Sequence, residues 1–296
     1  MPEKLFITGG SGFLGGHLVA LASQHYEVHA TYFSHPAKSE NVFWHFLDLK
    51  DEDQLKRTVQ KIKPDIIIHN AAMANIDLCE VNKNLAHQVN YEATVTLAEL
   101  IHTSGTRLIF ISTDNVFDGQ RGNYKETDPP NPVNYYGLTK FRAEEAIMDL
   151  CDNYVIARVA LIYGFPHLQG NSFLVQVLRN VKSSTPIKGF TDQFRSPIYV
   201  VNLAEILLEL TKTTWQGILH LGSPDRISRY DFIKLFFQIH KIENIPVIPV
   251  RMQDVQLKAS RPSDLTLNIN LAKNILKTPI LDCQTGLKQM SIQAKI

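Results

Sequence analysis

The sequence predicts an α/β fold with a doubly wound parallel sheet and a smaller mixed C-terminal part. Short apolar runs rich in β-branched and aromatic residues recur through the first 163 residues, and amphipathic stretches of helical length separate most of them. A glycine-rich turn follows the first apolar run. Strands that alternate with helices pair in parallel through right-handed crossovers, so these observations favour helices on both faces of one sheet.

The predicted strands lack clean polar alternation, which is typical of strands buried on both faces. They span residues 4–8, 27–33, 41–47, 65–69, 107–113 and 154–163. Amphipathic patterns predict helices over 12–25, 51–62, 85–105 and 134–150. Within 41–47 we expect Phe43 and Trp44 to belong to the core.

After residue 163 the strand and helix rhythm loosens. The patterns there predict helices over 171–182, 201–212 and 230–241, a loop over 185–199 and a strand over 217–222. A ligand in an open α/β sheet lies outside the carboxyl ends of the strands and needs a cover. We therefore expect a dinucleotide-binding domain over 1–163 and a mainly substrate-binding part over 164–296, with residues near 195–222 returning to the main domain.

Composition narrows the class of partner. Thirty basic and twenty-nine acidic residues leave a formal charge of +1, so no overall field attracts nucleic acid or a membrane surface. Three widely spaced cysteines argue against a disulfide framework and favour a reducing cytoplasm. No signal peptide is read before the apolar run at 5–7, and no run reaches the roughly 20 residues of a membrane span. We expect a soluble protein in the cytoplasm.

Histidines are numerous but show no metal-binding pattern. Eleven are scattered through the chain without a nearby set of Cys, His or Asp at ligand spacing, so we expect no metal. His69 ends a buried strand and is expected to be a core histidine with its hydrogen bonds satisfied.

The glycine turn has the spacing Gly9-x-x-Gly12-x-x-Gly15, with Phe13 and Leu14 inside it. It lies between a strand and a helix, where the first glycine allows a tight turn and the second lets the backbone approach a pyrophosphate. The third lets the helix pack close to the sheet. This context predicts a Rossmann-type dinucleotide site that contacts all five residues.

The end of the second strand indicates which dinucleotide binds. Sites that prefer NAD place a carboxylate there, on the adenosine ribose. This sequence instead has Ser34, His35 and Lys38, which could donate to a 2′-phosphate. We predict NADP, with NAD as the alternative.

The stretch YYGLTK places Tyr136 and Lys140 four residues apart on a predicted helix, and therefore on one face. An ammonium beside a phenol, aided by an oxidised nicotinamide, favours phenolate and would lower the tyrosine pKa toward neutrality. The strand 107–113 ends at Thr113, at the carboxyl edge of the sheet, where its hydroxyl could orient the same carbonyl. These three residues are the predicted catalytic set.

Together these motifs resemble the extended short-chain dehydrogenase/reductase family, and more narrowly its dTDP-4-dehydrorhamnose reductase branch. The resemblance rests on TGGSGFLG, Asn70-Ala71-Ala72, Ile76-Asp77-x-x-Glu80, STDNVFDG, ETDPPNP, YGLTK, ARVALIYG, DQFRSP and Arg261-Pro262. It implies NADPH-dependent reduction of a 4-keto nucleotide sugar, as in dTDP-rhamnose biosynthesis. It also implies roles for individual residues: Tyr136 as proton donor, Lys140 as its pKa partner and ribose ligand, Thr113 at the carbonyl, Asp48 and Leu49 near adenine, and Ala71 and Ala72 in the cofactor cleft.

The substrate is less well specified than the cofactor. The branch usually carries tryptophan where this chain has Leu161, and glutamine at Phe13. Candidate substrate-binding residues are Thr113, Asp114, Asn171, Arg195 and Arg261, of which the arginines could neutralise a diphosphate. The sugar, the base and the product stereochemistry stay open.

Two other functions fit the same motifs. The branch also resembles the regulatory beta subunit of methionine adenosyltransferase, a non-catalytic partner protein with the same cofactor fold. A nucleotide-sugar epimerase or dehydratase is a further alternative, although a dehydratase would carry an acidic pair where this chain has Asp114-Asn115. The expected partners are a nucleotide-sugar substrate and a second copy of the chain in a homodimer.

Overall fold

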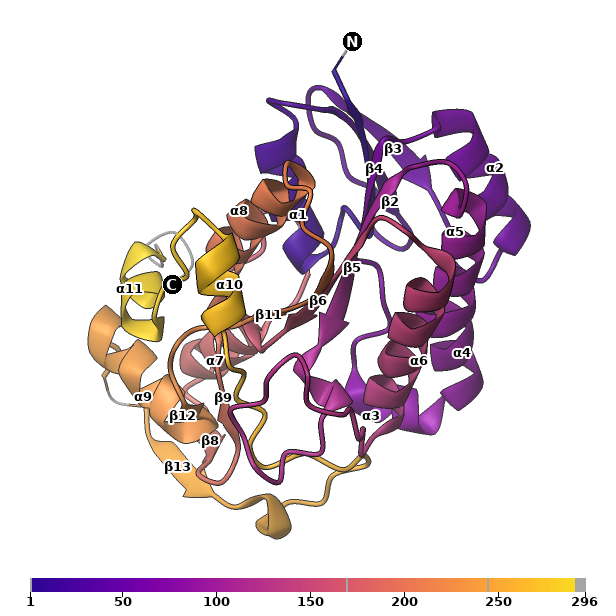
Figure 1. The fold of residues 1–296 in the computed structure, drawn as a ribbon. Coiled ribbons are helices and arrows are strands. Elements are labelled where there is room, and N and C mark those ends of the chain that lie inside the picture. Colours follow the sequence, from indigo (N-terminus) through magenta and orange to yellow (C-terminus); the bar gives the residue numbers. More distant parts are fainter. Residues whose placement is uncertain (1, 169, 244, 291–296) are drawn as a thin grey trace.

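The computed structural model describes residues 2–168, 170–243 and 245–290. Its centre is a seven-stranded, all-parallel sheet in the order β11-β6-β5-β4-β1-β2-β3 (Figure 1). The strands are β1 (Lys4–Thr8), β2 (Glu27–Tyr32), β3 (Val42–Phe46), β4 (Ile66–His69), β5 (Arg107–Thr113), β6 (Tyr154–Val159) and β11 (Gly217–Leu221). The strand order reverses between β1 and β4, so the predicted doubly wound, Rossmann-type sheet is confirmed.

Helices cover both faces of this sheet. On one side, at the left in Figure 1, lie α1 (Phe13–Ala22) and α8 (Val200–Thr211). On the other side lie α2 (Glu52–Ile62), α5 (Ala93–Ile101) and α6 (Tyr135–Leu150). Each layer buries its own cluster of aliphatic side chains against the strands, which fixes α6 over β5 and β6.

The C-terminal part has a separate apolar core, at the lower left in Figure 1. Its elements are α7 (Phe173–Lys182), β8 (Ile187–Phe190), α9 (Arg229–His240), β13 (Val247–Val250) and α11 (Cys283–Gln289). Shorter elements connect it to the main sheet: β7 (Ile162–Tyr163), β9 (Phe194–Arg195), β10 (Ile198–Tyr199), β12 (Ile227–Ser228), η3 (Met252–Asp254) and α10 (Asn270–Ile275).

The predicted loop over 185–199 is wrong, because it contains β8, β9 and β10. Each pairs with a strand distant in sequence: β8 with β13, β9 with β12, and β10 with β7. Strands of two to four residues leave no readable alternation, so only the tertiary partners reveal them. The helix α8 and strand β11 that follow pack with the main sheet, while the division of the chain at residue 163 stays a prediction.

The strand β3 also corrects an expectation. It is the outermost strand, none of its residues is fully buried, and Phe43 is 56% exposed. Its ring stacks on His29 from the neighbouring strand at 4.9 Å between centroids. The prediction of burial on both faces is therefore wrong for this strand, since an edge strand has a neighbour on one side only. Trp44 does pack against the core.

The predicted helix over 85–105 is divided. It consists of α4 (Lys83–His87), the π-helical turn η1 (Gln88–Glu92) and α5, and the short helix α3 (Ile76–Val81) precedes it. The π-helical turn points the Asn90 side chain inward, where it binds both the N–H and the carbonyl of Met73. The Asn90 amide also donates to Thr139 of α6 at 3.2 Å, so this turn joins the segment after β4 to α6.

Two further observations bear on the class of protein. Among the described residues, no helix is long and apolar enough to cross a membrane. All three cysteines are free and buried.

Candidate active site

The stretch that contains Tyr136 begins α6, and two side chains fix where that helix starts. Asn134 caps it by accepting a hydrogen bond from the Gly137 N–H at 2.9 Å. Glu80, on α3, accepts from the Tyr135 N–H at 3.0 Å. Together they satisfy two N–H groups that a helix leaves free at its start and place Tyr136 in the first turn.

Gly137 explains why this turn comes so close to β5. A Cβ at this position would collide with the carbonyl oxygen of Asn115, in the 3-10 turn η2 (Asp114–Val116) directly after β5. Only glycine permits that approach, which brings the Tyr136 phenol beside the Thr113 hydroxyl. The glycine that follows Tyr136 in YYGLTK therefore positions the predicted catalytic tyrosine.

The Thr113 hydroxyl is held in place by the turn that follows it. It accepts from the Asn115 N–H and from the Asn115 amide, both at 3.2 Å, and donates to the Asp114 carboxylate at 3.2 Å. Asn134 in turn donates to the Asn115 side chain at 3.3 Å. The sequence analysis missed Asn115 and Asn134, although an asparagine just before a helix is a recognisable cap.

The acidity of Tyr136 differs from the expectation. Burial raises the pKa of the phenol strongly, the nearby Thr113 hydroxyl lowers it, and Asp114 and Cys79 raise it further. Lys140 contributes no resolved effect, so the predicted lowering of the tyrosine pKa by this lysine is wrong for the protein alone. The phenol is protonated at neutral pH, which is the state that a proton donor requires.

Lys140 is the group whose pKa moves close to neutral pH. Its side chain is 2% exposed, and its ammonium lies 3.8 Å from the centre of the Phe110 ring. Burial lowers the pKa of this lysine to about 7, and the charge of Glu144 opposes that shift. No hydrogen bond or ion pair of this ammonium is seen within the described part of the chain, so its donors are free for a ligand.

The glycine turn has the geometry predicted for a phosphate-binding loop. Gly9 adopts φ +66°, which favours glycine, and a Cβ there would lie 2.9 Å from the Cα of Ala71. A Cβ on Gly15 would collide with the Gly9 carbonyl, so glycine lets α1 begin close to β1. The residues present therefore fit a dinucleotide.

A largely apolar cleft of about 340 Å³ adjoins this turn. Five predicted cofactor residues line it: Gly9, Asp48, Leu49, Ala71 and Ala72. Tyr32, Phe33 and Met73 line it as well, and the sequence analysis did not single them out. The cleft has the size and polarity of a site for an aromatic base.

The other predicted cofactor residues lie outside the lining of this cleft. Gly12, Phe13, Leu14 and Gly15 form the turn and the start of α1, and a Cβ on Gly170 would lie 2.8 Å from the Phe13 nitrogen. Ser34, His35 and Lys38 are exposed on the loop after β2, where Ser34 and His35 contact each other at 2.8 Å. Their roles stay predictions.

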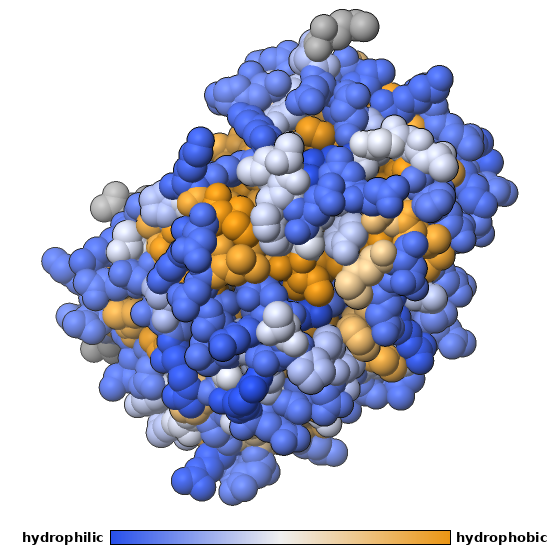
Figure 2. All heavy atoms as spheres, in the orientation of Figure 1, coloured by the Kyte–Doolittle hydropathy of each residue, from blue (hydrophilic) through white to orange (hydrophobic). Residues whose placement is uncertain are grey.

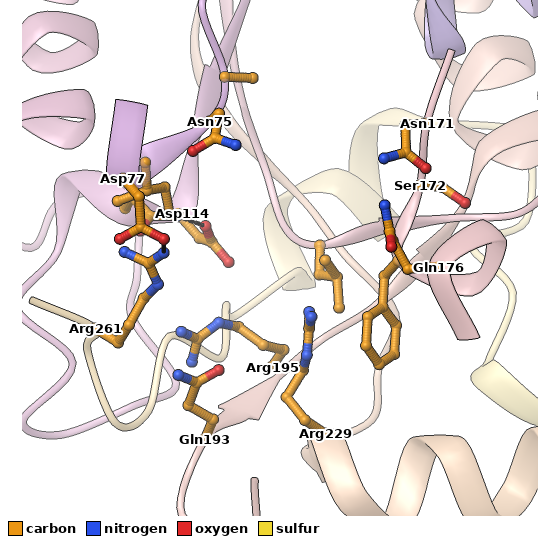
Figure 3. A pocket seen from close by; sticks show the side chains of 15 residues that line it. Asn75, Asp77, Asp114, Asn171, Ser172, Gln176, Gln193, Arg195, Arg229 and Arg261 are labelled. Atoms are coloured by element: carbon orange, nitrogen blue, oxygen red, sulfur yellow. Dashed lines mark hydrogen bonds and ion pairs between the residues drawn. The ribbon is translucent and has the colours of Figure 1, made fainter. Parts of the chain in front are cut away.

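A second cavity, of about 480 Å³, is polar and positively charged (Figure 3). Four predicted substrate residues line it: Asp114, Asn171, Arg195 and Arg261. The fifth, Thr113, is absent from its lining but directly precedes Asp114. Leu161, at the position of the expected tryptophan, lines it too. The cavity thus gathers residues from β5 and from the C-terminal part.

Three further residues of this cavity had no predicted role: Arg229, and Gln193 and Asp77, which belong to motifs of the family resemblance. Arg229 begins α9 after an ordinary Ser-cap pattern, so nothing local distinguishes it from a surface arginine. Asp77 pairs with Arg261 at 2.8 Å, and in Figure 3 the two side chains point toward each other at one side of the cavity. That ion pair joins α3 to the C-terminal segment.

The arginines of this cavity differ in their partners. Arg195 is buried and donates to the backbone carbonyls of Phe194, Pro262 and Ser263. The Arg229 guanidinium stacks on the Phe173 ring at 3.7 Å, and among the described residues no carboxylate pairs with it. Burial and the charges of Arg195 and Arg261 lower the pKa of Arg229 to about 9. An anionic ligand would relieve this repulsion.

Asp114 provides the opposite charge. It is 3% exposed, its Oδ2 has no hydrogen-bond partner, and in Figure 3 it points into the cavity. Burial raises the pKa of this carboxyl to about 6, although Arg195 and Arg229 lower it. An unpaired buried acceptor favours a ligand hydroxyl or amide as its donor.

His69 is a core residue, as predicted. Its ring nitrogens contact the Thr8 hydroxyl at 2.8 Å and the Thr94 hydroxyl at 3.1 Å. Burial lowers its pKa to about 3, so the ring is neutral.

The surface of the molecule is shown in Figure 2, in the orientation of Figure 1. On this face hydrophobic residues gather across the centre, with hydrophilic residues around them.

Comparison with known proteins decides the family. The family model described as the RmlD substrate binding domain matches residues 3–295. The chain belongs to the RmlD substrate binding domain family. The predicted resemblance to the dTDP-4-dehydrorhamnose reductase branch is thereby confirmed.

Relatives within and near this family carry two kinds of name. A dTDP-4-dehydrorhamnose reductase of Aggregatibacter actinomycetemcomitans is 29% identical over 99% of both chains. The beta subunit of methionine adenosyltransferase 2 from Danio rerio is 28% identical over 74% of this chain and 69% of that one. A crystal structure of dTDP-4-dehydrorhamnose reductase from Bacillus anthracis in complex with NADP is 29% identical. It covers 98% of this chain and 99% of that one, with a TM-score of 0.88.

Proposed function

We propose that this chain is an NADPH-dependent oxidoreductase that reduces the keto group of a 4-keto nucleotide sugar, as a dTDP-4-dehydrorhamnose reductase does. The reductase names of its relatives and the NADP in the Bacillus anthracis structure agree with the predicted function class and cofactor. The observation that carries the proposal is local: a protonated phenol lies beside the Thr113 hydroxyl at the end of β5, next to a cavity rich in arginine.

The cofactor, when bound, supplies the hydride. The described residues that would hold it are the glycine turn, the apolar cleft and the Lys140 ammonium, whose donors are free for a ribose. Asp48 accepts from the Lys50 N–H at 3.0 Å and pairs with the Lys50 ammonium, which holds it at the cleft wall. Preference for NADP would rest on Ser34, His35 and Lys38.

The protein's contribution to the reaction is placement and proton supply. The Thr113 hydroxyl, oriented by Asn115, would turn its proton from the Asp114 carboxylate to the substrate carbonyl oxygen, and the Tyr136 phenol would deliver its proton to that oxygen. A neutral phenol is the required starting state, and burial provides it. In the cofactor complex the Lys140 ammonium would stabilise the phenolate that remains, an effect absent from the protein alone.

The polar cavity is suited to the rest of the substrate. Arg195, Arg229 and Arg261 supply three positive charges for a diphosphate, and Asp114 supplies an acceptor for a sugar hydroxyl. Leu161 leaves this cavity without the aromatic platform that the branch usually has. The identity of the sugar and of the base therefore calls for a panel of substrates.

The test is to incubate the protein and NADPH with a panel of 4-keto nucleotide sugars, including dTDP-4-dehydrorhamnose, and to follow the absorbance of the reduced nicotinamide. We expect substrate-dependent oxidation with at least one member of the panel. Absence of oxidation with every member, from protein that binds NADPH, would reject the reductase.

A regulatory role is the second candidate, because the methionine adenosyltransferase beta subunit is nearly as similar over the part that matches. It predicts NADPH binding without turnover and a change in the activity of a methionine adenosyltransferase on mixing. Thr113, Tyr136 and Lys140 are all present in the sequence, and the Tyr136 phenol lies beside the Thr113 hydroxyl, which supports the enzyme. Asp114-Asn115 lacks the acidic pair of a dehydratase, so epimerase or dehydratase chemistry ranks below both of these functions.

Other expectations stay predictions. They are the cytoplasmic location, the homodimer, a role in dTDP-rhamnose biosynthesis and the absence of a nucleic-acid partner. Analytical ultracentrifugation would decide the oligomeric state.

A further inference from the structure

A buried ion pair lies one helical turn beyond Lys140, away from the part of the site assigned above. Glu144 of α6 accepts from the Nε of Arg158 at 3.1 Å and from its Nη2 at 2.7 Å. It also accepts from the Ser112 hydroxyl. Glu144 is 0% exposed and Arg158 is 1% exposed. These contacts tie α6 to β5 and β6, where Ser112 and Arg158 are paired across the strands.

This pair adjoins residues of the proposed mechanism on two elements. Glu144 is four residues after Lys140 on α6, and therefore on the same helix face. Ser112 directly precedes Thr113 on β5. A change in the charge of Glu144 would thus reach the lysine and the carbonyl-orienting hydroxyl together.

The surroundings of the Lys140 ammonium contain little charge besides this pair. From β5 it meets the Phe110 ring, and from β4 it meets His69, which is neutral at working pH. From its own helix, the negative charge of Glu144 acts on the Lys140 ammonium. Arg158, on β6, forms an ion pair with that same carboxylate. Among the described residues, Glu144 is the anion identified as acting on this lysine.

Arg158 has surroundings of its own. Its guanidinium lies 5.1 Å from the Phe117 ring, and its Nη1 has no partner. Its charge also acts on Glu126 and on His220, a buried histidine whose pKa is lowered to about 3. Glu144 therefore acts on two buried cations, on Arg158 as its ion-pair partner and on Lys140 through its charge.

We propose that Glu144 and Arg158 are positioning residues for the reaction and act through Lys140: Glu144 holds the lysine ammonium charged, and Arg158 limits how strongly it does so. The proposal rests on the proposed function, because the charge of Lys140 matters there for the phenolate and the ribose. Loss of Glu144 would leave a neutral amine at neutral pH. Loss of Arg158 would leave a tight Lys140–Glu144 pair.

A purely structural role would not require ionic groups here. A buried ion pair can be replaced by apolar residues of similar volume at little or no cost in stability, so charge at this position serves more than packing. The pair also joins the two elements that carry Thr113, Tyr136 and Lys140, which are β5 and α6, to β6. Its effect on charge and its effect on folding can be separated by substituting each partner.

The experiment measures the titration of Lys140 directly, without cofactor or substrate. Protein labelled with ¹³C at lysine Cε is titrated by NMR, and the Lys140 signal is assigned as the one lost in Lys140→Arg. We expect Glu144→Gln to lower the titration midpoint by about one pH unit, and Arg158→Met to raise it by about the same amount. If the ion pair only stabilised the fold, these two substitutions would not move the Lys140 titration midpoint in opposite directions.

Stability is controlled with a double variant. Glu144→Gln leaves the buried Arg158 guanidinium without its partner and is the variant at risk of unfolding, whereas Glu144→Gln/Arg158→Met removes both charges of the pair. We expect the double variant to fold and to titrate at or below the midpoint of the original protein. An Arg158→Met midpoint that stays unchanged or falls, or a double variant that titrates above the original protein, would overturn the proposal.

The consequence for turnover is read separately. If the protein reduces a 4-keto nucleotide sugar, turnover is measured against pH. In folded Arg158→Met, we expect the alkaline limb of this profile to shift to higher pH by the same amount as the NMR midpoint. If the shifts occur by NMR but the original protein oxidises NADPH with no member of the panel, the proposed function fails while the charge relation stands. If the protein turns over substrate but the Lys140 midpoints do not move in the variants, the proposed role of Glu144 and Arg158 fails while the proposed function stands.

Discussion

The apolar cleft and the arginine cavity meet along the same segment after β4, yet they are built in opposite ways. The cleft, lined by Gly9, Asp48, Ala71 and neighbouring residues, comes from consecutive turns of the N-terminal half, and its walls are apolar. The cavity draws on α3, on the turn after β5 and on four separate stretches of the C-terminal part, and its walls are polar. A cofactor site can thus be carried by local backbone geometry, whereas the substrate site depends on charges that only tertiary packing brings together.

The predicted catalytic residues Thr113, Tyr136 and Lys140 line neither region and carry the largest expected effect. Tyr136→Phe removes the proton donor, so we expect turnover to fall by roughly 10²- to 10⁴-fold. The affinity for NADPH should change little, because the hydroxyl contacts the reacting oxygen. Tyr135→Phe, at the neighbouring position of the same helix turn, is the matched control and should retain activity. Equal turnover in the Tyr136 variant and the control would reject the proton-donor role.

The difference between the regions predicts a variant that affects one of them alone. Arg229→Met removes a cation from the cavity, and we expect KM for the nucleotide sugar to rise roughly 10- to 100-fold through loss of one charge-assisted contact. The dissociation constant of NADPH should not change. The free energy of unfolding should hold or rise, because Arg229 is repelled by Arg195 and Arg261.

Arg179→Met, on the exposed face of α7, is the control for a general charge effect. Should both arginine variants raise KM equally, long-range attraction and not the cavity would be responsible.

The cavity also predicts a pH-dependent stability that the cleft lacks. The pKa of Asp114 is about 6 in the folded protein against 3.8 for a free side chain, so the folded state holds its proton more tightly. Ionisation therefore costs stability as pH rises from about 4 to about 6, by about 3 kcal/mol in total. Asp114→Asn should remove this slope. Urea unfolding at several pH values would measure it, and parallel slopes in the two proteins would contradict the buried, unpaired state of Asp114.

The smallest expected effect lies at the edge strand. Phe43→Thr replaces an exposed ring on β3 that lines neither the cleft nor the cavity. It should change the free energy of unfolding by no more than about 0.5 kcal/mol. Turnover and NADPH affinity should match those of the original protein. Loss of NADPH binding in this variant, measured by fluorescence titration, would indicate that β3 supports the cleft.

How much could be read from the sequence follows the same division. The strands β1, β4 and β5 and the glycine turn were predictable, because periodicity and glycine spacing are local properties. The place of Phe43 was not, since strand order decides which strand is the edge. Arg195 and Arg261 were predicted as possible diphosphate ligands, and both line the cavity. Arg229 was not predicted, because a first-turn arginine after a serine cap has many ordinary explanations.

The pKa pattern was the least predictable feature. From spacing alone, Lys140 beside Tyr136 suggested an acidic phenol, yet burial acts on both groups and keeps the phenol neutral while bringing the lysine close to neutrality. The extent of burial depends on Gly137, Phe110 and the Glu144–Arg158 pair, which come from three elements. Sequence spacing states which residues share a face, and only the packed structure states which of them is charged.

The most direct test of the reductase follows the hydrogen itself. The protein is incubated with a 4-keto nucleotide sugar and NADPH that carries deuterium at the nicotinamide position from which hydride leaves, and the product is analysed by NMR. We predict that the original protein places deuterium at C4 of the sugar. Tyr136→Phe, at equal NADPH occupancy, should form little deuterated product. A product without deuterium at C4, or undiminished transfer in the phenylalanine variant, would contradict the account.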